Sequence, residues 1–188
     1  MPAPNASEVA DRALVLYAVI RRGTIELALE EFGYEERRMR QAEQAREETD
    51  RWLARESLDG AVTVLERRLF EAVSGSWPRE AVTDGIWKKE SLAVLLWVLQ
   101  HTPALPPIDE EAEAPVLDAV ITRYGSVSSF RSNGRLREVE DLQTAWLEAD
   151  AWLGATEGGV GDDAVVASIA AERFRSLAWL RDAAAATP

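Results

Sequence analysis

The stretch "GIWKKESLAVLLWVLQ", residues 85–100, decides the fold, because a glutamate stands between two tryptophans at the head of a long apolar run. At 3.6 residues per turn, Glu90 shares one stripe of a helix with Trp87 and Trp97. The leucines that follow cover most of the remaining surface, so other helices must surround this one. We therefore predict an all-α fold packed around a central apolar helix at about residues 86–101.

The rest of the chain also shows the spacing of helices, without convincing strand alternation or internal repeats. Its length of 188 residues favours a single helical domain over residues 1–188. A proline-rich loop at 102–115 and a glycine-rich connector at 154–161 should interrupt it, the loop being the best candidate for a hinge. The remaining helices are expected at about residues 7–32, 34–58, 63–74, 116–124, 136–153 and 163–182. Gly23 is expected to kink or break its helix, Gly85 to interrupt the chain before the central helix, and residues 125–134 to form a turn.

The chain carries a net charge of -12. Binding to nucleic acid or to an anionic membrane requires a positive field, so neither is expected as a partner. Acidic residues are concentrated between Asp109 and Asp118, in a stretch that contains no lysine or arginine. This segment is either a solvated loop or a contact surface for another protein with a basic face.

Several features favour a cytoplasmic protein of a bacterium. The chain has no cysteine, so it can form neither a disulfide nor a thiolate metal site. Its start has no secretory signal pattern, and its longest apolar run is too short to cross a bilayer. Alanine and arginine are abundant while lysine is rare, which is typical of a GC-rich bacterial genome.

No complete catalytic signature occurs in the sequence. His101 is the only histidine, and the end of a helix is where a positively charged imidazole is favoured for structural reasons. No nucleophile turn or phosphate loop is present, and no cofactor or metal site is predicted. The pairs Glu138/Asp141 and Glu47/Asp50 have the spacing that helical pyrophosphohydrolases use for divalent cations, so a metal-dependent hydrolase of nucleotides is kept as an alternative.

Five segments of the chain resemble the bacterial family known as domain of unknown function 4272. They are "DRALVLYAVI" from residue 11, "LERRLFEA" from 65, "WKKESLAVLLWVL" from 87, "EVEDLQTAW" from 138 and "ERFRSLAWL" from 172. The resemblance implies an all-helical bacterial domain and brings no established activity. Relatives often have a histidine where this chain has Ala145, so histidine-dependent chemistry is not expected here.

Charged residues recur beside apolar positions within or close to these segments. We predict a buried polar network from this set: Arg12, Glu26, Glu90, Asp141, Glu172 and Arg173. A buried ion pair fixes helix packing with little net gain in stability, and we expect Glu90 to pair with Arg12 or Arg173. The aromatic candidates are Trp87, Trp97, Trp146 and Trp179, which fill a core or line a ligand pocket. Trp77, beside a proline, is expected to be exposed.

These observations favour a non-enzymatic function. We predict a protein–protein interaction or regulatory module, of which toxin neutralisation is one example, and the nucleotide hydrolase remains the alternative.

Overall fold

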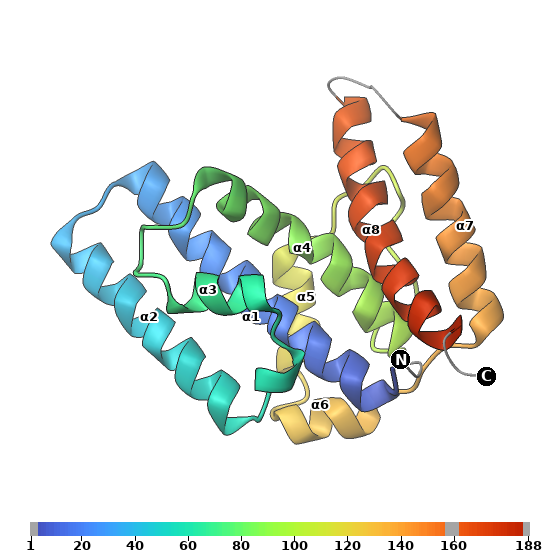
Figure 1. The fold of residues 1–188 in the computed structure, drawn as a ribbon, viewed down its shortest axis with the longest axis horizontal. Coiled ribbons are helices and arrows are strands. Elements are labelled where there is room, and N and C mark those ends of the chain that lie inside the picture. The colour runs from blue at the N-terminus through green and yellow to red at the C-terminus, as the bar shows by residue number, and fades with distance from the viewer. Residues whose placement is uncertain (1–3, 157–161, 186–188) are drawn as a thin grey trace. The chain divides into compact units, whose positions relative to one another are not determined.

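The computed structural model describes residues 4–156 and 162–185. Within these residues the chain forms eight α-helices, one short 3-10 helix and no strand (Figure 1). The all-α prediction is therefore confirmed. Most of the predicted glycine-rich connector, residues 157–161, lies outside the described residues.

The helices follow one another with short connections, the longest described one being the proline-rich segment. They are α1 (Ala6–Phe32), α2 (Glu36–Arg55), η1 (Asp59–Ala61), α3 (Val64–Glu71), α4 (Arg79–Val98), α5 (Ala114–Thr122), α6 (Val127–Asn133), α7 (Val139–Ala155) and α8 (Asp162–Ala185). The chain divides into two compact units, Leu14–Lys88 and Met1–Ala13 with Lys89–Pro188. We call these the middle unit and the terminal unit. The single-domain organisation stays a prediction.

Gly23 and Gly85 do not end helices, so a break at Gly23 and the interruption expected at Gly85 are both wrong. They lie inside α1 and α4, where the two helices approach each other closely in the middle unit. A Cβ on Gly23 would lie 3.5 Å from the carbonyl carbon of Gly85, and a Cβ on Gly85 would lie 3.1 Å from the Trp77 ring. The glycines thus allow backbone-to-backbone packing.

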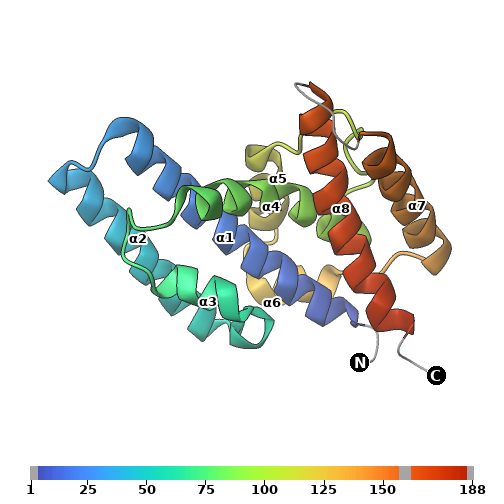
Figure 2. The ribbon, with the colours of Figure 1, turned by 45° about the horizontal axis from the view of Figure 1, so that its top comes forward.

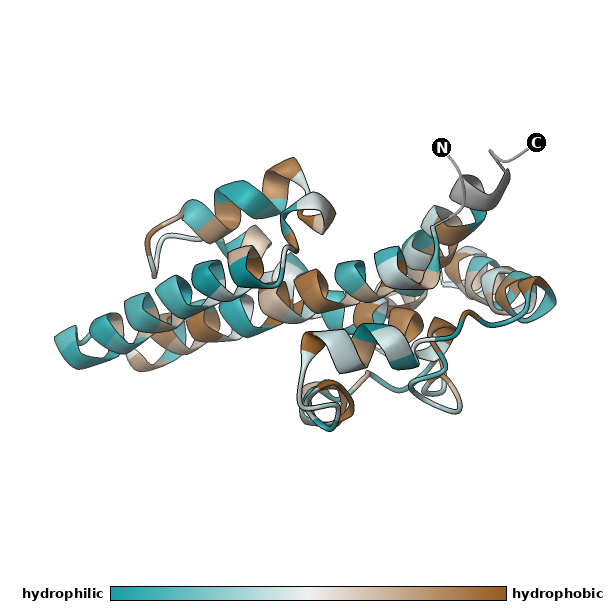
Figure 3. Ribbon diagram, turned by 90° about the horizontal axis from the view of Figure 1, so that it is seen from below, coloured by the Kyte–Doolittle hydropathy of each residue, from teal (hydrophilic) through white to brown (hydrophobic). Residues whose placement is uncertain are grey.

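In the middle unit, α2 carries mostly hydrophilic residues and buries only Ala42 and Leu53 (Figure 3, teal helix at left). Helix α3 leaves Val64 and Leu65 exposed. The helix instead buries Phe70 and Glu66. Glu66 completes a capping box with Thr63, so its burial serves the start of the helix.

In the terminal unit, residues 92–98 of α4 are all buried apart from the half-buried Trp97, as a helix apolar on nearly all sides requires. The helix ends at Val98, three residues before the expected end. Gln100 adopts a left-handed conformation with φ 59°, and the His101 N–H bonds back to the Leu96 carbonyl at 2.8 Å. Helices α7 and α8 lie side by side (Figures 1 and 2).

Two further boundaries in this unit differ from the expectation. The presumed turn at 125–134 contains α6, which starts at a Ser126 cap that accepts a bond from the Ser129 N–H. Helix α5 begins at Ala114 and holds Pro115 in its first turn, where a missing N–H is harmless. The proline-rich loop is therefore shorter than the predicted 102–115.

We predict that Gly85→Leu destabilises the protein by about 2 kcal/mol, because the added side chain would push Trp77 and α1 away. A denaturant melt measures the change. Gly154 is the matched control, since it is also helical and nothing lies within 4 Å of its missing Cβ. Gly154→Leu should leave stability unchanged or raise it by up to about 1 kcal/mol. Equal losses in both variants would refute the close-packing interpretation.

Candidate functional site

A buried ion pair joins α4 to α8 in the terminal unit. Glu90 has an exposed fraction of 0% and Arg173 of 3%. The Arg173 Nε and Nη2 donate to Glu90 Oε2 at 3.1 and 2.9 Å. Of the two arginines considered from the sequence, Arg173 is thus the one that Glu90 contacts.

The remaining donors of Arg173 bind the proline-rich segment. Nη1 donates to the carbonyl oxygens of Pro106 and Pro107 at 2.8 and 3.2 Å, and Nη2 to that of Glu110 at 3.1 Å. Glu90 Oε1 accepts the Ala112 N–H at 2.6 Å. All five N–H donors of the guanidinium are therefore used, and the buried pair holds the segment by its backbone.

A second arginine fixes the start of the same segment. Arg137 donates from Nη2 to the carbonyls of Thr102 and Pro103, and from Nε to that of Trp97. Its guanidinium also lies 4.7 Å from the centre of the Trp97 ring. The segment is thus tied at its backbone along most of its length, and its role as a hinge stays a prediction.

The acidic side chains of the held segment, and the one that follows on α5, face solvent. Asp109, Glu110, Glu111, Glu113 and Asp118 are all exposed. Glu111 forms an ion pair with the half-buried Lys89. The result is a row of carboxylates on a backbone whose position is set from inside the unit.

The neighbours of the buried pair repeat the link between the two helices. Ser91 Oγ donates to Glu172 Oε2 at 2.7 Å, and Glu172 also pairs with Arg175 one turn later on α8. The dipeptide Glu90–Ser91 thus faces the dipeptide Glu172–Arg173. Two polar contacts across an apolar interface specify one register of packing.

A cavity of about 450 Å³ lies beside Arg173 in the terminal unit. One wall is the proline-rich segment at 103–108, and α8 contributes Arg173 and Leu177. Trp97 belongs to its apolar lining, and the opposite wall is a stripe of α7. Three of the five segments that carry the family resemblance meet here.

The α7 wall brings two carboxylates to the cavity, Asp141 and Glu148, with Ala145 between them. Both acids are exposed, and neither carboxylate forms an ion pair or hydrogen bond with another residue that the structure describes. Asp141 was expected in the buried network, whereas no pattern in the sequence singled out Glu148. Across the described residues, no group of three or more histidine, aspartate or glutamate side chains is arranged to hold a metal ion.

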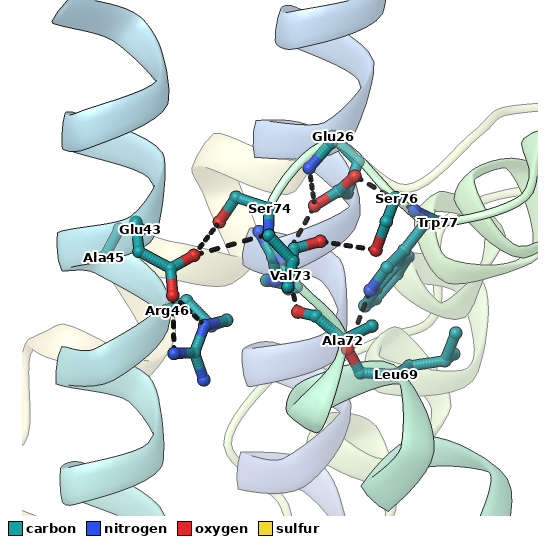
Figure 4. Close-up of polar contacts among 12 residues, drawn as sticks. Glu26, Glu43, Ala45, Arg46, Leu69, Ala72, Val73, Ser74, Ser76 and Trp77 are labelled. Carbon is teal, nitrogen blue, oxygen red and sulfur yellow. Dashed lines mark hydrogen bonds and ion pairs between the residues drawn. The ribbon is translucent and has the colours of Figure 1, made fainter. Parts of the chain in front are cut away.

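A separate polar cluster in the middle unit holds the connection between α3 and α4 (Figure 4). Glu26 accepts the N–H groups of Gly75 and Trp77 at 3.0 and 3.3 Å. Glu43 on α2 accepts the N–H and hydroxyl of Ser74. A hydrogen bond from Arg46 lowers the pKa of Glu43 to about 2, so its carboxylate stays charged over the physiological range.

Arg22 completes this cluster and was missed by the sequence analysis. Its exposed fraction is 1%, and it donates to Glu26 and to the Ala72 carbonyl. Burial lowers its pKa, although Glu26 opposes the shift. The only signal in the sequence was the four-residue spacing to Glu26 on an apolar helix.

The tryptophans do not gather in one aromatic pocket. Trp97 lines the cavity, Trp87 is half-buried on α4, and Trp179 is 39% exposed. Trp146 packs on Phe174 and has the Arg181 guanidinium 4.0 Å from its ring centre. The expectation of an exposed Trp77 is wrong, because this residue is buried and donates its indole N–H to the Leu69 carbonyl (Figure 4).

Two other candidates lie outside the cavity. Arg12 is half-buried on α1 in the terminal unit and is not among the partners of Glu90. His101 is buried between Tyr124 and Phe130, and its Nδ1 lies 2.7 Å from the Tyr124 hydroxyl. Burial lowers its pKa, which favours neutral imidazole over the cation expected at a helix end.

The chain belongs to the family whose model is described as Domain of unknown function (DUF4272), which matches residues 2–187. No curated protein and no solved structure has significant similarity to it. Among the described residues, no helix combines the length and the apolar character needed to cross a bilayer.

We predict that Glu90→Ala lowers the free energy of unfolding by about 3 kcal/mol, because it strands the buried Arg173. Replacing both partners with leucine should recover only part of this loss. The carbonyls of Pro106, Pro107 and Glu110 would still lack a donor. Denaturant melts give the energies, and hydrogen exchange at Ala112 reports release of the segment.

The control for this experiment is Glu36→Ala, which removes an exposed carboxylate that pairs with Arg40. We expect a change of about 0.5 kcal/mol or less. If Glu90→Ala is as stable as the parent, the structural role is wrong and Glu90 becomes a functional residue.

We also predict that millimolar magnesium or manganese raises the melting temperature by about one degree or less, because among the described residues two carboxylates line the cavity. Calorimetry with sodium chloride of equal ionic strength as the control measures this. A rise of many degrees would favour the metal-dependent hydrolase.

Proposed function

We propose that this member of the family is a non-enzymatic module of the bacterial cytoplasm that binds a basic partner protein through its acidic segment, residues 109–118. Regulation of that partner, as in the neutralisation of a toxin, is the role we favour. The observation that carries the proposal is the combination of exposed carboxylates with a backbone held by Arg173 and Glu90.

The charge of the segment supports a basic partner. The carboxylates of Asp109, Glu110 and Glu113 have no opposite charge bound to them among the described residues. A row of like charges is unfavourable in isolation, and a basic surface relieves the repulsion. Complementary charge of this kind raises association rates and suppresses wrong partners.

The fixed backbone supports a binding role over that of a merely solvated loop. A flexible segment loses conformational entropy when it binds, at about 0.5–1.5 kcal/mol for each side chain that becomes ordered and more for the backbone. Here the ordering of the backbone is already complete in the folded unit, through buried donors and acceptors. A merely solvated loop would not require a buried arginine whose five N–H donors bind a glutamate and the loop backbone.

We predict that the chain binds a short peptide of alternating lysine and serine, and that the triple charge reversal Asp109→Lys, Glu110→Lys, Glu113→Lys weakens binding by about tenfold or more. Fluorescence anisotropy of the labelled peptide measures the affinity at low and physiological salt. Rising salt should weaken the binding of the parent, because exposed charges are screened.

A matched control separates this surface from the net charge of the whole chain. The triple reversal Glu31→Lys, Glu47→Lys, Glu48→Lys changes the charge equally at exposed positions of α1 and α2. We expect this triple variant to weaken peptide binding by a small factor only. Equal weakening by both triples would mean that bulk charge attracts the peptide, and the proposal would then fail.

A further inference from the structure

We infer that the cavity beside Arg173 receives an arginine or lysine side chain of the basic partner, with the partner's backbone continuing along the acidic segment. This inference rests on the proposed function and names the chemistry of its anchor residue. It is carried by the cavity, by the two carboxylates on its α7 wall and by the saturated state of Arg173.

The first step is the exclusion of an anionic ligand. A buried arginine at a cavity wall is ordinarily an anion site, since its donors fit carboxylates and phosphates. In this cavity every donor of Arg173 already binds Glu90 or a backbone carbonyl, and Glu90 cancels its charge. The arginine therefore has no donor left for a ligand.

The second step is the charge that remains. Asp141 and Glu148 lie seven residues apart on α7, two turns along one face, and both belong to the cavity wall. Neither has a partner among the residues that the structure describes. With Arg173 neutralised, the cavity presents a net negative wall, and a cation is the ligand that it attracts.

The third step is the apolar part of the lining. Trp97, Leu105, Ile108 and Leu177 belong to the wall. An arginine or lysine has a long apolar stem that packs on such surface while its charged end reaches a carboxylate. A bare metal ion would leave this surface unused, whereas a basic side chain uses both kinds of wall.

Size and continuity point to a side chain from a protein segment. A volume of about 450 Å³ lies in the lower part of the range of small-ligand pockets, about 300–1,000 Å³. Ile108 lines the cavity, and the exposed acids begin with the next residue, Asp109. A chain with one basic side chain in the cavity would meet further carboxylates as it leaves.

The experiment is a titration of the full chain, followed by nitrogen–proton NMR spectra, with N-acetyl-arginine methylamide as the probe. We expect saturable shifts of the Trp97 indole N–H and of the amides of residues 141–149. The citrulline analogue has the same shape without the charge and should bind about tenfold more weakly. The double variant Asp141→Asn, Glu148→Gln should weaken the arginine probe by a similar factor, and both substitutions lie at exposed positions that the fold tolerates.

A second variant blocks the cavity without changing its charge. Ala145→Phe adds a ring to the α7 wall between the two carboxylates and should abolish the shifts. Shifts that are absent in the parent, equal for citrulline, or unchanged in Asp141→Asn, Glu148→Gln would overturn the inference.

The outcomes also separate this inference from the proposed function. The triple reversal at Asp109, Glu110 and Glu113 should leave the affinity for the single arginine probe within about twofold of the parent, while it weakens binding of the lysine peptide. If the peptide depends on the acidic segment and the probe does not bind, only the cavity inference falls. If the probe binds and no peptide does, the cavity takes a free cation, and both the protein anchor and the proposed function are overturned.

Discussion

The buried pair of Glu90 and Arg173 is the constraint on which the terminal unit depends. An ionised side chain inside a protein must find a partner and satisfy its remaining hydrogen-bonding groups, because isolated charge is very unfavourable there. Arg173 meets this requirement with one glutamate and three backbone carbonyls, all contributed by α4 and the proline-rich segment. The need to satisfy one guanidinium therefore sets the path of a segment that has no secondary structure of its own.

The prolines explain why arginine side chains can hold this particular segment by its backbone. A proline residue has no backbone N–H but keeps its carbonyl. A proline-rich run therefore has more backbone acceptors than donors, and its carbonyls require donors from elsewhere. Arg173 supplies them at Pro106 and Pro107, and Arg137 supplies them at Thr102 and Pro103. The same ordering leaves the acidic side chains facing solvent and leaves the cavity between the segment and α7. The hydrogen bonds that hold the segment in place thus also position the exposed carboxylates and the cavity, on which the proposed function rests.

The middle unit holds its connection in the same way but with the opposite charge, since carboxylates there bind backbone N–H groups where Arg173 binds backbone carbonyls. There buried or partly buried carboxylates accept backbone N–H groups from the connection between α3 and α4, as Glu26 does from Gly75 and Trp77. Arg22 balances the charge of Glu26. In each unit a charged side chain on a regular helix fixes an irregular connection, which local sequence preferences alone would leave loosely defined.

The sequence by itself determined the helical class, because apolar residues recur with the helical period and the run after Glu90 is apolar on nearly every side. It also marked Glu90 and Arg173, since a charge beside a core stripe requires a partner. The predictions for Gly23, Gly85 and Trp77 from the sequence were wrong, because the roles of these residues depend on how closely α1 and α4 approach. Only the tertiary structure decided that Arg173 binds the proline-rich segment and that Glu148 joins Asp141 at one cavity. These contacts join residues tens of positions apart, and such pairings depend on the packing of whole helices, which no local pattern records.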